Sequence, residues 1–459
     1  MYDLIIIGMG PGGYEATLTA LRKGLNIAIV EKSKVGGNCL NRACIPTKYF
    51  RSAAHQLEKL KKLSEYGIVV ENYTVNYSKA FEGKEKTITF LRNSLINLLK
   101  SKKVPVYRGT GKIVGKNQVE VTYLEGDREV IEGKFILIAT GSIPSSIGNI
   151  KPDGELIITT EQFMDNLNKL PESLLVIGAG VAGCELGYIS AVFGSKVHIV
   201  EISDRLLPSK IFSKEISKNL LRKFNQLGIE TNFNTTVTDI SRDNQKATVT
   251  LSNGKILTVD KILLTVGRVP NTSDIDTIGI EKDSKGFIKV NDNLQTNFEN
   301  IYAVGDVVNS PMLAHIASYE AKIVLHNITE NEKISPDYTL TPWSVFSGYE
   351  IGHVGLNEEE AKERGIEVIT GYYPYLYNEK AADELDNEGY VRLYFNKSDL
   401  KIIGADVVGI GASELIHQIS LFIKHGYTAK EIHDFIYFHP SLSEIFIYAT
   451  YDVAIGKLF

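Results

Sequence analysis

The chain has few cysteines, no excess of basic residues and no long apolar run, and each absence excludes a class of protein. Its 459 residues include only three Cys, too few for the disulfide framework of a small secreted domain. The formal net charge of -5 offers no basic surface for nucleic acid. No apolar stretch approaches the ~20 residues that span a bilayer, and the opening MYDLIIIG is too short for a signal peptide. We therefore expect a cytoplasmic protein with no nucleic-acid and no membrane partner.

A pattern of strand, glycine-rich turn, helix and second strand occurs twice, 170 residues apart. The first copy has strands at 4–7 and 27–30, and the second has strands at 174–177 and 197–200. Each copy carries three turn glycines and a closing acid: Gly8, Gly10, Gly13 and Glu31, then Gly178, Gly180, Gly183 and Glu201. Two complete copies are strong evidence for two dinucleotide sites, whereas a lone Gly-x-Gly-x-x-Gly would be weak.

The residue types in both copies suit a dinucleotide. The first glycine allows a tight turn, the second lets a pyrophosphate approach the backbone, and the third lets the helix pack on the strand. The helix N-terminus supplies N–H donors, and the acid accepts hydrogen bonds from a ribose diol. At the second site, the carboxylate of Glu201 would repel a 2′-phosphate. The pattern therefore favours NAD over NADP.

Two of the three cysteines stand five positions apart, in GGNCLNRACIPTK at residues 36–48. A close pair in a reducing compartment is typically redox-active or metal-binding. Cys39 and Cys44 have no second Cys pair and no His cluster nearby, so we expect no metal site. The spacing suits an offset of one turn at the start of a helix. Cys184 lies in an apolar helical pattern and is interpreted as a buried small hydrophobe.

Other segments predict the domain organisation. FILIATGSIP at 135–144 and ILLTVGRVPN at 262–271 have the form of buried strands that end domains. IYAVGDVV at 301–308 is a short strand that delivers Asp306 to a loop. Residues 52–100 carry amphipathic, Lys-rich helical patterns. After Pro336 mixed strands and helices indicate a separate domain. The predicted fold class is α/β, with two Rossmann-like dinucleotide-binding domains and a C-terminal α+β dimerisation domain.

The motifs GGNCLNRACIPTK, ATGS, VGRVPN, AVGDV, PMLAH and FHPSLSE, in this order, resemble the FAD-dependent pyridine nucleotide-disulfide oxidoreductases over essentially the whole chain. The resemblance implies FAD and NAD as cofactors and four domains. These are an FAD-binding domain at 1–143, an NAD-binding domain at 144–267, a central domain completing the FAD site at 268–335, and an interface domain at 336–459.

The resemblance also implies a role for each motif residue. FAD would be held by Gly8, Gly10, Gly13, Glu31, Lys48, Gly111, Thr140, Gly141, Ser142, Asp306, Met312, Leu313, Ala314 and His315. NAD would be held by Gly178, Gly180, Gly183, Glu201 and Gly267. Lys48 and Glu185 would form an ion pair beside the flavin, and Lys48 would tune the ring nitrogen that passes hydride.

In the same comparison Cys39 is the thiol that exchanges with substrate and Cys44 is the charge-transfer thiolate next to the flavin. His439 would be the base for thiol exchange, oriented by Glu444, and would reach the flavin site of the other subunit of a homodimer. The implied reaction oxidises protein-bound dihydrolipoamide to lipoamide, with NAD+ as final acceptor. Implied partners are lipoyl domains and the acyltransferase core of a 2-oxoacid dehydrogenase, or a glycine cleavage system. An NADH-dependent reductase of another small disulfide, or a non-catalytic flavin-binding scaffold, are the alternatives.

Several positions depart from the family pattern. Asn38 replaces Thr or Ser before the first cysteine, and Ala43 replaces Gly. Tyr437 and Phe438 replace a His-Ala pair before the predicted base, and Tyr349 replaces a proline. Because Tyr437 and Phe438 are bulky, we expect them to affect which disulfide substrate can enter the site.

Overall fold

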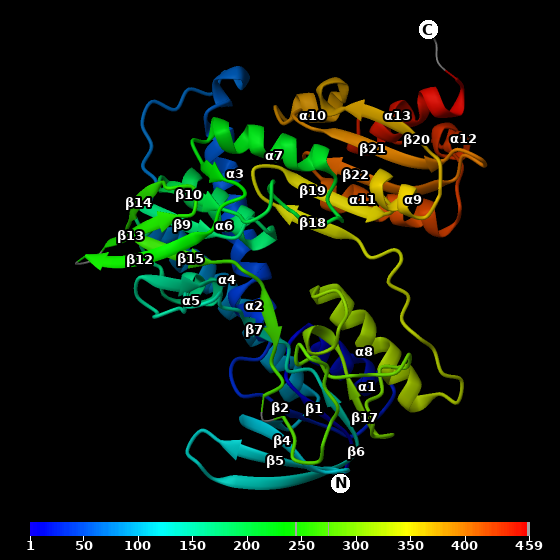
Figure 1. Cartoon of the computed structure of the whole chain (residues 1–459). Coiled ribbons are helices and arrows are strands. Elements are labelled where there is room, and N and C mark those ends of the chain that lie inside the picture. Colours follow the sequence, from blue (N-terminus) through cyan, green and yellow to red (C-terminus); the bar gives the residue numbers. More distant parts are fainter. Residues whose placement is uncertain (244–245, 274, 457–459) are drawn as a thin grey trace.

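The computed structural model describes residues 1–243, 246–273 and 275–456 (Figure 1). Its helices are α1 (Pro11–Arg22), α2 (Gly37–Arg42), α3 (Cys44–Leu60), α4 (Tyr77–Ser101), α5 (Thr160–Asn166), α6 (Val181–Val192), α7 (Lys214–Gln226), α8 (Ala314–Thr329), α9 (Glu358–Glu363), α10 (Glu379–Asp383), α11 (Ala412–Lys424), α12 (Ala429–Asp434) and α13 (Ile445–Ala454). Four 3-10 turns are η1 (Leu63–Tyr66), η2 (Gly305–Val307), η3 (Tyr375–Tyr377) and η4 (Leu442–Glu444). Among these described helices, none has both the length and the apolar character required to cross a membrane.

The first sheet is built around the buried strand β1. Its order is β3-β2-β1-β6-β5-β4, and β17 pairs with β6. The strands are β1 (Tyr2–Ile7), β2 (Ile27–Val30), β3 (Val106–Tyr107), β4 (Gly109–Gly115), β5 (Gln118–Tyr123), β6 (Arg128–Ile138) and β17 (Ile301–Ala303). The β3, β2, β1, β6 and β17 strands are parallel, and α1 lies beside α8 (Figure 1). Since parallel strands are covered on both faces, β1 and β2 read as continuous apolar runs.

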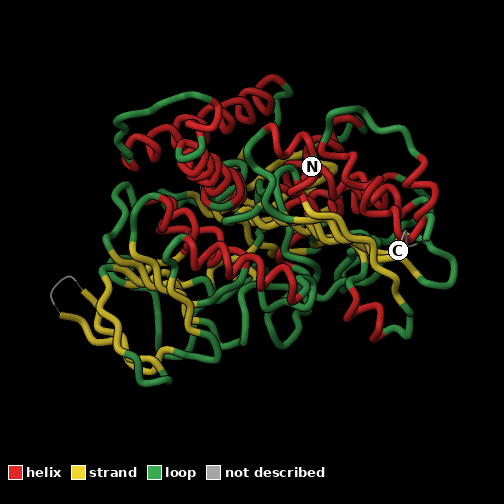
Figure 2. Tube along the Cα trace, turned by 90° about the horizontal axis from the view of Figure 1, so that it is seen from above, coloured by secondary structure: helices red, strands yellow, loops and turns green. Residues whose placement is uncertain are grey.

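The second dinucleotide unit repeats this arrangement in a five-stranded parallel sheet of order β11-β10-β9-β15-β8. Its strands are β8 (Ile157–Thr159), β9 (Ser173–Ile177), β10 (Lys196–Val200), β11 (Glu230–Asn232) and β15 (Lys261–Leu264). A small antiparallel sheet, β12 (Val237–Asp243), β13 (Lys246–Leu251) and β14 (Ile256–Val259), lies at one edge of the molecule (Figure 2). The connections between the two units pair as β7 (Ser142–Pro144) and β16 (Arg268–Pro270).

The C-terminal part forms an antiparallel sheet of order β18-β19-β22-β21-β20. Its strands are β18 (Trp343–Phe346), β19 (Glu350–Gly355), β20 (Val368–Pro374), β21 (Tyr390–Asn396) and β22 (Ile402–Val408). The α11 and α13 helices pack on one face, where Val354, Leu393 and Phe395 join Ile416 and Phe446 in a buried core. The other face meets the second dinucleotide unit through residues such as Ile351 and Tyr390.

These features confirm the predicted fold class. Two details differ from expectation. Asp306 lies in the 3-10 turn η2 rather than in a loop, and the helical pattern of 52–100 is interrupted because residues 67–76 contain no helix. Pro336 lies in the segment between α8 and β18. The four domain limits stay a prediction, although β17 joins the first sheet from a position after the whole second unit.

Tyr349, which stands at a family proline position, lies at the junction of three parts of the chain. Its side chain is buried, and its hydroxyl donates to Glu388 Oε2 at 2.9 Å. Lys223 of α7 is 3.6 Å from the same carboxylate and 3.1 Å from Glu58 of α3. Burial raises the pKa of Tyr349, which keeps the phenol protonated as the donor. The tyrosine thus holds the Glu388 carboxylate, which Lys223 of α7 connects to Glu58 of α3.

Tyr349→Phe should remove the bond to Glu388 and lower the unfolding temperature by roughly 1–2 °C, since one such bond contributes about 1 kcal/mol. Calorimetry against Tyr377→Phe, whose ring is 62% exposed, measures the difference. Equal unfolding temperatures in the two variants would contradict this account of Tyr349.

Candidate active site

The two glycine turns have the same geometry. The first glycine of each is left-handed, with φ of +99° at Gly8 and +103° at Gly178. A Cβ on Gly13 would lie 2.0 Å from the Gly8 carbonyl oxygen, and a Cβ on Gly183 would lie 2.0 Å from that of Gly178. Because no side chain fits there, the third glycine lets the helix close on the turn, as the sequence predicts.

The middle glycine of each turn faces open space. A Cβ on Gly10 would meet nothing nearer than a Gly37 carbon at 3.9 Å, and a Cβ on Gly180 would meet no described atom within 4 Å. Each turn therefore leaves its backbone accessible in front of a helix N-terminus. This is the arrangement that admits a pyrophosphate to backbone N–H donors.

The acids that close the two copies also hold equivalent positions. Glu31 accepts hydrogen bonds from the backbone N–H groups of Met9 and Ser33, both at 2.8 Å. Glu201 accepts from Ala179 at 2.6 Å and Ser203 at 2.8 Å. Each carboxylate thus fixes its own glycine turn, and each of its oxygens keeps a second lone pair for a ribose hydroxyl.

The first turn opens into a cavity of about 390 Å³. Predicted site residues that line it are Gly8, Gly10, Glu31, Cys39, Cys44, Gly111, Thr140, Gly141, Ser142, Asp306, Met312 and Ala314. Gly13, Lys48, Leu313 and His315 lie outside the lining, and His315 Nε2 is 3.0 Å from the Pro342 carbonyl oxygen. The second turn contains Gly178, Gly180 and Gly183, and Glu201 binds it through the Ala179 N–H. Gly267 (φ +103°) directly precedes β16. The cysteine pair therefore lines the first site.

Ser142, a predicted FAD residue, and two residues without a predicted role position Asp306 and its turn in this cavity. Ser142 Oγ donates to Asp306 Oδ2 at 2.5 Å, and Arg268 Nε donates to Ser142 Oγ at 2.7 Å. Glu320, buried in α8, accepts from the Gly305 N–H at 2.6 Å, and burial raises the pKa of its carboxyl. Arg268 belongs to the VGRVPN motif, so its role in the site could have been predicted from the sequence. Glu320 lies in an ordinary helical pattern, and no motif indicates its role.

Two asparagines of α2 test whether this cavity suits FAD. Asn41 Nδ2 donates to the carbonyl oxygens of Val35 and Gly37 at 3.1 and 2.8 Å. The Oδ1 atom of the same side chain therefore points away from these two carbonyl groups. That atom and Asn38 Oδ1 are buried and have no hydrogen-bond partner in the part of the chain that the structure describes. Unpartnered buried acceptors are costly, and both residues line the cavity. A ligand with hydroxyl and N–H donors, such as FAD, fits this set.

The two cysteines lie on either side of a helix break. Cys39 belongs to α2, Cys44 is the first residue of α3, and Ala43 between them has φ -129° and ψ -89°. Where the spacing suggested an offset of one turn at the start of a helix, the structure has two helices that meet at Ala43. Both thiols are free, and a hydrogen bond between them is the main cause of the pKa shift of each. Cys184 is fully buried, as the sequence indicates.

The hydrogen bond makes the two thiols unequal. The bond from Cys39 lowers the pKa of Cys44, and Lys48 lowers it further, against the opposing effect of burial. The same bond raises the pKa of Cys39, and burial adds to this. A reduced pair therefore holds its negative charge on Cys44 and its proton on Cys39.

Lys48 lies one turn along α3 from Cys44 and reaches the second dinucleotide unit. Its Nζ is 3.0 and 3.1 Å from the two carboxylate oxygens of Glu185 in α6. The Glu185 carboxylate is almost fully buried and also accepts the Phe346 N–H at 2.9 Å. The predicted ion pair is therefore present, and it places a cation beside the cysteine pair and between the two units.

His439 and Glu444 form a hydrogen-bonded dyad in the C-terminal part. His439 Nδ1 is 2.9 Å from Glu444 Oε1, while Glu444 Oε2 accepts the Ser441 N–H at 2.7 Å. Glu444 is mostly buried, whereas 69% of the His439 side chain is exposed. Neither residue lines the cavity of the cysteines. The structure thus joins the dyad residues to each other but not to the cysteine pair of their own chain.

The bulky residues before the dyad point in different directions. Tyr437 turns inward, since its hydroxyl donates to the Ile432 carbonyl oxygen at 3.1 Å and its ring lies beside Phe446. Phe438 is 79% exposed. Only one of the two bulky departures therefore presents its side chain to an approaching molecule.

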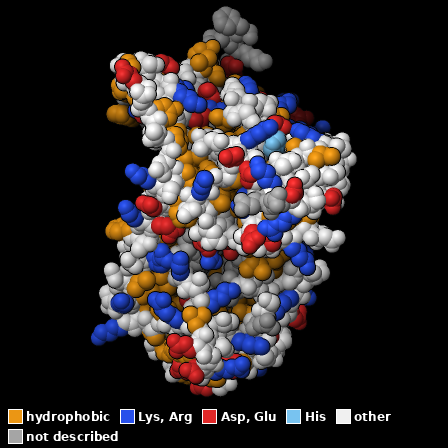
Figure 3. Space-filling model, turned by 90° about the vertical axis from the view of Figure 1, so that its left-hand side faces the viewer, with side chains coloured by type: hydrophobic (Ala, Val, Ile, Leu, Met, Phe, Trp, Pro, Cys, Tyr) orange, Lys and Arg blue, Asp and Glu red, His pale blue; other side chains and the backbone are white. Residues whose placement is uncertain are grey.

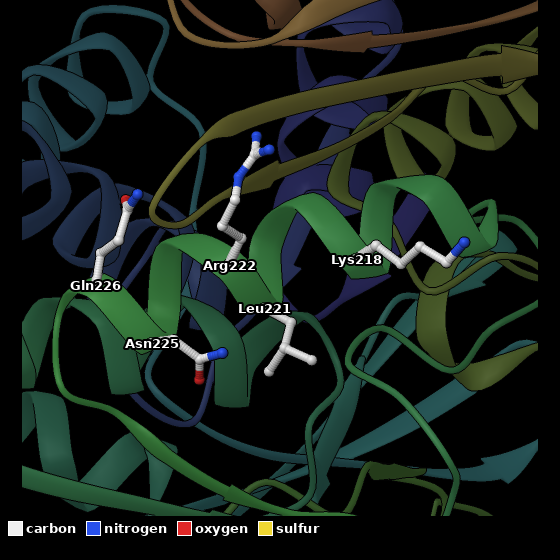
Figure 4. A pocket seen from close by; sticks show the side chains of 5 residues that line it. All are labelled: Lys218, Leu221, Arg222, Asn225 and Gln226. Atoms are coloured by element: carbon white, nitrogen blue, oxygen red, sulfur yellow. The ribbon is translucent and has the colours of Figure 1, made fainter.

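A second hollow, of about 520 Å³, lies on α7 and carries no comparable chemistry (Figure 4). Its lining comes from one helix: Lys218, Leu221, Arg222, Asn225 and Gln226. Such a surface opens broadly to solvent and brings no groups together from different elements, so it is not a candidate site.

Two family models match the chain. The model of the pyridine nucleotide-disulphide oxidoreductases matches residues 2–321, and the model of their dimerisation domain matches residues 341–450. The chain belongs to the pyridine nucleotide-disulphide oxidoreductase family. This confirms the resemblance drawn from the motifs, and it makes the chain an FAD- and NAD-dependent oxidoreductase whose C-terminal part is a dimerisation domain.

Relatives in this oxidoreductase family match over almost the whole chain. Dihydrolipoyl dehydrogenase of Bacillus subtilis (strain 168) is 37% identical, with 99% of this chain and 97% of the relative covered. The mitochondrial dihydrolipoyl dehydrogenase of Homo sapiens is 36% identical, with 99% and 91% covered. Among solved structures, LpdA from Mycobacterium tuberculosis gives a TM-score of 0.90 at 25% identity, with 98% and 99% covered. The HOCl-induced flavoprotein disulfide reductase RclA from Escherichia coli gives 0.87 at 26%, with 97% and 98% covered.

Asn38→Leu should speed the release of FAD roughly fivefold, because the loss of one acceptor costs about 1 kcal/mol. Asn38→Asp keeps an acceptor and should stay close to wild type. Flavin fluorescence during release from the purified protein measures the rate, with Asn225→Leu on α7 as the control. Faster release from the Asp variant than from the Leu variant would mean that Asn38 faces a phosphate and that the acceptor assignment is wrong.

The pKa of the Cys44 thiol should depend on whether residue 39 carries a hydrogen-bond donor. Cys39→Ala removes the hydrogen bond to Cys44, so the pKa of Cys44 should rise and its thiolate should appear at higher pH than in Cys39→Ser, which keeps a hydroxyl donor. Ultraviolet thiolate absorbance against pH, with Cys44→Ser as the blank, gives the two midpoints. Coincident midpoints would refute the assigned direction of the bond.

Proposed function

We propose that this chain is a dihydrolipoyl dehydrogenase, which oxidises protein-bound dihydrolipoamide to lipoamide with NAD+ as the final acceptor. The observation that carries the proposal is the pair of free thiols, Cys39 and Cys44, that lines the first dinucleotide cavity. Curated relatives with this activity in their names support it over the full length of the chain. FAD, when bound, supplies the two-electron chemistry between the sulfur pair and NAD.

The residues of the chain account for the sulfur exchange. In the oxidised enzyme Cys39 and Cys44 form a disulfide, and one substrate thiolate attacks the sulfur of Cys39. The S–S bond breaks, and Cys44 leaves as a thiolate that Lys48 stabilises. The second substrate thiol then attacks its own mixed disulfide, which releases lipoamide and returns Cys39 as a thiol. The substrate loses two electrons and two protons, and the enzyme disulfide becomes a thiol and a thiolate.

We assign the proton transfers to His439. Thiol exchange needs a thiolate, and a dithiol substrate is largely protonated at neutral pH. His439 Nδ1 is held by Glu444, so Nε2 is the ring nitrogen that we assign to take that proton. The remaining proton rests on Cys39, where the raised pKa retains it.

The dyad is proposed to act on the cysteine pair of a second subunit. His439 is exposed and absent from the cavity of its own chain, and it lies in the dimerisation domain. We further propose that the homodimer receives lipoyl domains attached to the acyltransferase core of a 2-oxoacid dehydrogenase, or the lipoyl carrier of a glycine cleavage system. Glu201 supports NAD as the dinucleotide of the second site.

The two alternatives are less well supported. A flavin-binding scaffold would not need a hydrogen-bonded thiol pair or a histidine–carboxylate dyad. A reductase of another small disulfide would use the same machinery, but the relatives that match the full length are named dihydrolipoyl dehydrogenases. Turnover of lipoamide compared with a panel of other disulfides separates these functions.

His439→Gln should lower lipoamide turnover by roughly 10²- to 10⁴-fold, which is the usual contribution of a general base. NADH oxidation by an artificial acceptor should persist, since that reaction bypasses the disulfide. His425→Gln, at the end of α11, is a matched control.

A mixing experiment tests the origin of the base. Heterodimers of a His439→Gln chain and a Cys44→Ser chain contain one complete site, so lipoamide turnover should return on mixing. Verified heterodimers that stay inactive would show that His439 acts within its own subunit or not at all.

A further inference from the structure

The helix that carries Cys39 is short and has a backbone break at each end. Helix α2 has only six residues, and none of them is buried. Gly36 and Gly37 at its start are left-handed, with φ of +96° and +59°, and Ala43 after its end has φ -129° and ψ -89°. Cys44, by contrast, begins the 17-residue helix α3. The position of Cys39 relative to Cys44 therefore depends on what holds α2 in place.

Arg42, the last residue of α2, connects this helix to the second dinucleotide unit. Its Nε lies 2.6 Å from Asp165 Oδ2, and its Nη1 lies 3.8 Å from Glu161 Oε2. Both acids belong to α5, which follows β8 and contacts α2 (Figure 1). The Asn41 amide, in comparison, donates to carbonyl oxygens of its own segment, 34–37. Arg42 thus supplies the ion pairs between α2 and the second unit.

The α5 helix is itself held at both ends. At its start, Thr159 and Gln162 form a capping box. Near its end, Lys84 of α4 donates from Nζ to the Met164 carbonyl oxygen at 2.5 Å, and the Lys84 side chain is fully buried. Phe163 and Met164 are buried in the core of the second unit. Because a buried ammonium group that loses its acceptor is costly, α5 gives Arg42 a firm support.

The same helix supports the turn of Asp306. Glu161 accepts from Arg268 Nη2 at 3.1 Å, and Arg268 donates to Ser142, which donates to Asp306. Arg42, Glu161 and Arg268 all line the cavity of the cysteine pair. One element, α5, therefore holds both α2 and the turn of Asp306 around this cavity.

An ion pair by itself is an ordinary feature of this protein. Figure 3 shows Lys and Arg side chains beside Asp and Glu side chains on the side of the molecule that it presents. Arg242 on β12, for example, lies 2.7 Å from Glu155. Such exposed pairs usually contribute little to stability. What distinguishes Arg42 is its position between the two cysteines, one residue before the break that separates their helices.

We propose that Arg42 is a positioning residue, whose ion pairs with α5 keep Cys39 close to Cys44 and thereby set the reduction potential of the cysteine pair. Cys44 is fixed because Lys48 binds α3 to Glu185 of the second unit. When the S–S bond breaks, Cys39 is therefore the sulfur that can move away, together with α2. Two thiols that are held together form a disulfide more readily, so Arg42 favours the disulfide over the reduced pair. This inference rests on the proposed redox role of the pair, but not on lipoamide as the substrate.

Buffers of reduced and oxidised dithiothreitol measure this potential in the FAD-loaded protein. Dithiothreitol loses two electrons and two protons and forms its cyclic disulfide. The enzyme disulfide gains two electrons and one proton, which give the Cys39 thiol and the Cys44 thiolate, and the second proton goes to water. Acid quenching, alkylation and mass spectrometry give the reduced fraction at each buffer ratio. Arg42→Met should lower the equilibrium constant for disulfide formation roughly fivefold, which raises the potential of a two-electron couple by about 20 mV.

Asp165→Asn separates position from charge, because it removes the partner on α5 and keeps the charge of Arg42. If Arg42 acts through its contact with α5, the potential should rise as in Arg42→Met, and the double variant should rise no further. If Arg42 acted by charge alone, the two single variants would shift in opposite directions. A cation stabilises the Cys44 thiolate and an anion destabilises it, so Arg42→Met would then lower the potential. That result would overturn the proposal.

Arg242→Met is the matched control, since it removes an arginine–carboxylate pair of similar length and should leave the potential at its wild-type value. Equal potentials in Arg42→Met and Arg242→Met would overturn the proposal. If Arg42→Met does not fold or bind FAD, Asp165→Asn alone carries the test, and an unchanged potential in that variant also overturns it. Lipoamide turnover is measured separately. A cysteine pair that titrates as expected in a protein without lipoamide turnover would contradict the proposed function alone and support the role of Arg42.

Discussion

The Lys48–Glu185 ion pair connects the redox cysteines to the rest of the molecule. It fixes the first turn of α3, which begins at Cys44, against α6 of the second dinucleotide unit. Further along α3, Arg51 lies 3.6 Å from Glu350 and His55 lies 3.2 Å from Asp386, both in the C-terminal part. One helix therefore sets the position of the charged thiol relative to both dinucleotide sites and to the dimerisation domain. Because Glu185 is buried, losing Lys48 would leave a carboxylate without its counter-charge.

The two dinucleotide units use the same arrangement of glycine turn and carboxylate at two different sites. In both, a carboxylate accepts a hydrogen bond from a backbone N–H group of the turn, and the middle glycine leaves the backbone of the turn accessible to a ligand. What distinguishes the units lies outside the repeat. The first unit follows its second strand with α2 and α3 and their cysteines, whereas the second follows its second strand with a segment, 201–213, that contains no helix or strand and leads to α7. The chemical difference between the sites thus comes from the segments at the carboxyl end of equivalent strands, where ligands of parallel sheets bind.

The departures from the family pattern have different physical consequences. Tyr349 replaces a rigid residue with a hydroxyl donor at a domain junction, where Glu388 and Lys223 complete the interaction. Asn38 brings an unpartnered acceptor into the cofactor cavity. Phe438 exposes a large ring beside the dyad and changes the surface that meets a second chain or a substrate. A family comparison assigns none of these roles, because it transfers only what the residues have in common.

The fold class, the two glycine turns, the cysteine pair and the dyad could be predicted from the sequence. These depend on short-range rules: the glycines are required by backbone geometry, the apolar strands by burial, and Glu444 can reach His439 across five residues. The partition of charge between Cys39 and Cys44, the bond from Glu320 to the turn of Asp306 and the place of Tyr349 are visible only in the folded chain. The same holds for the separation of the dyad from the cysteines of its own chain. The charge partition depends on how the break at Ala43 places two thiols that are five residues apart, and the other outcomes depend on contacts between residues farther apart in the chain. Periodicity and spacing encode neither.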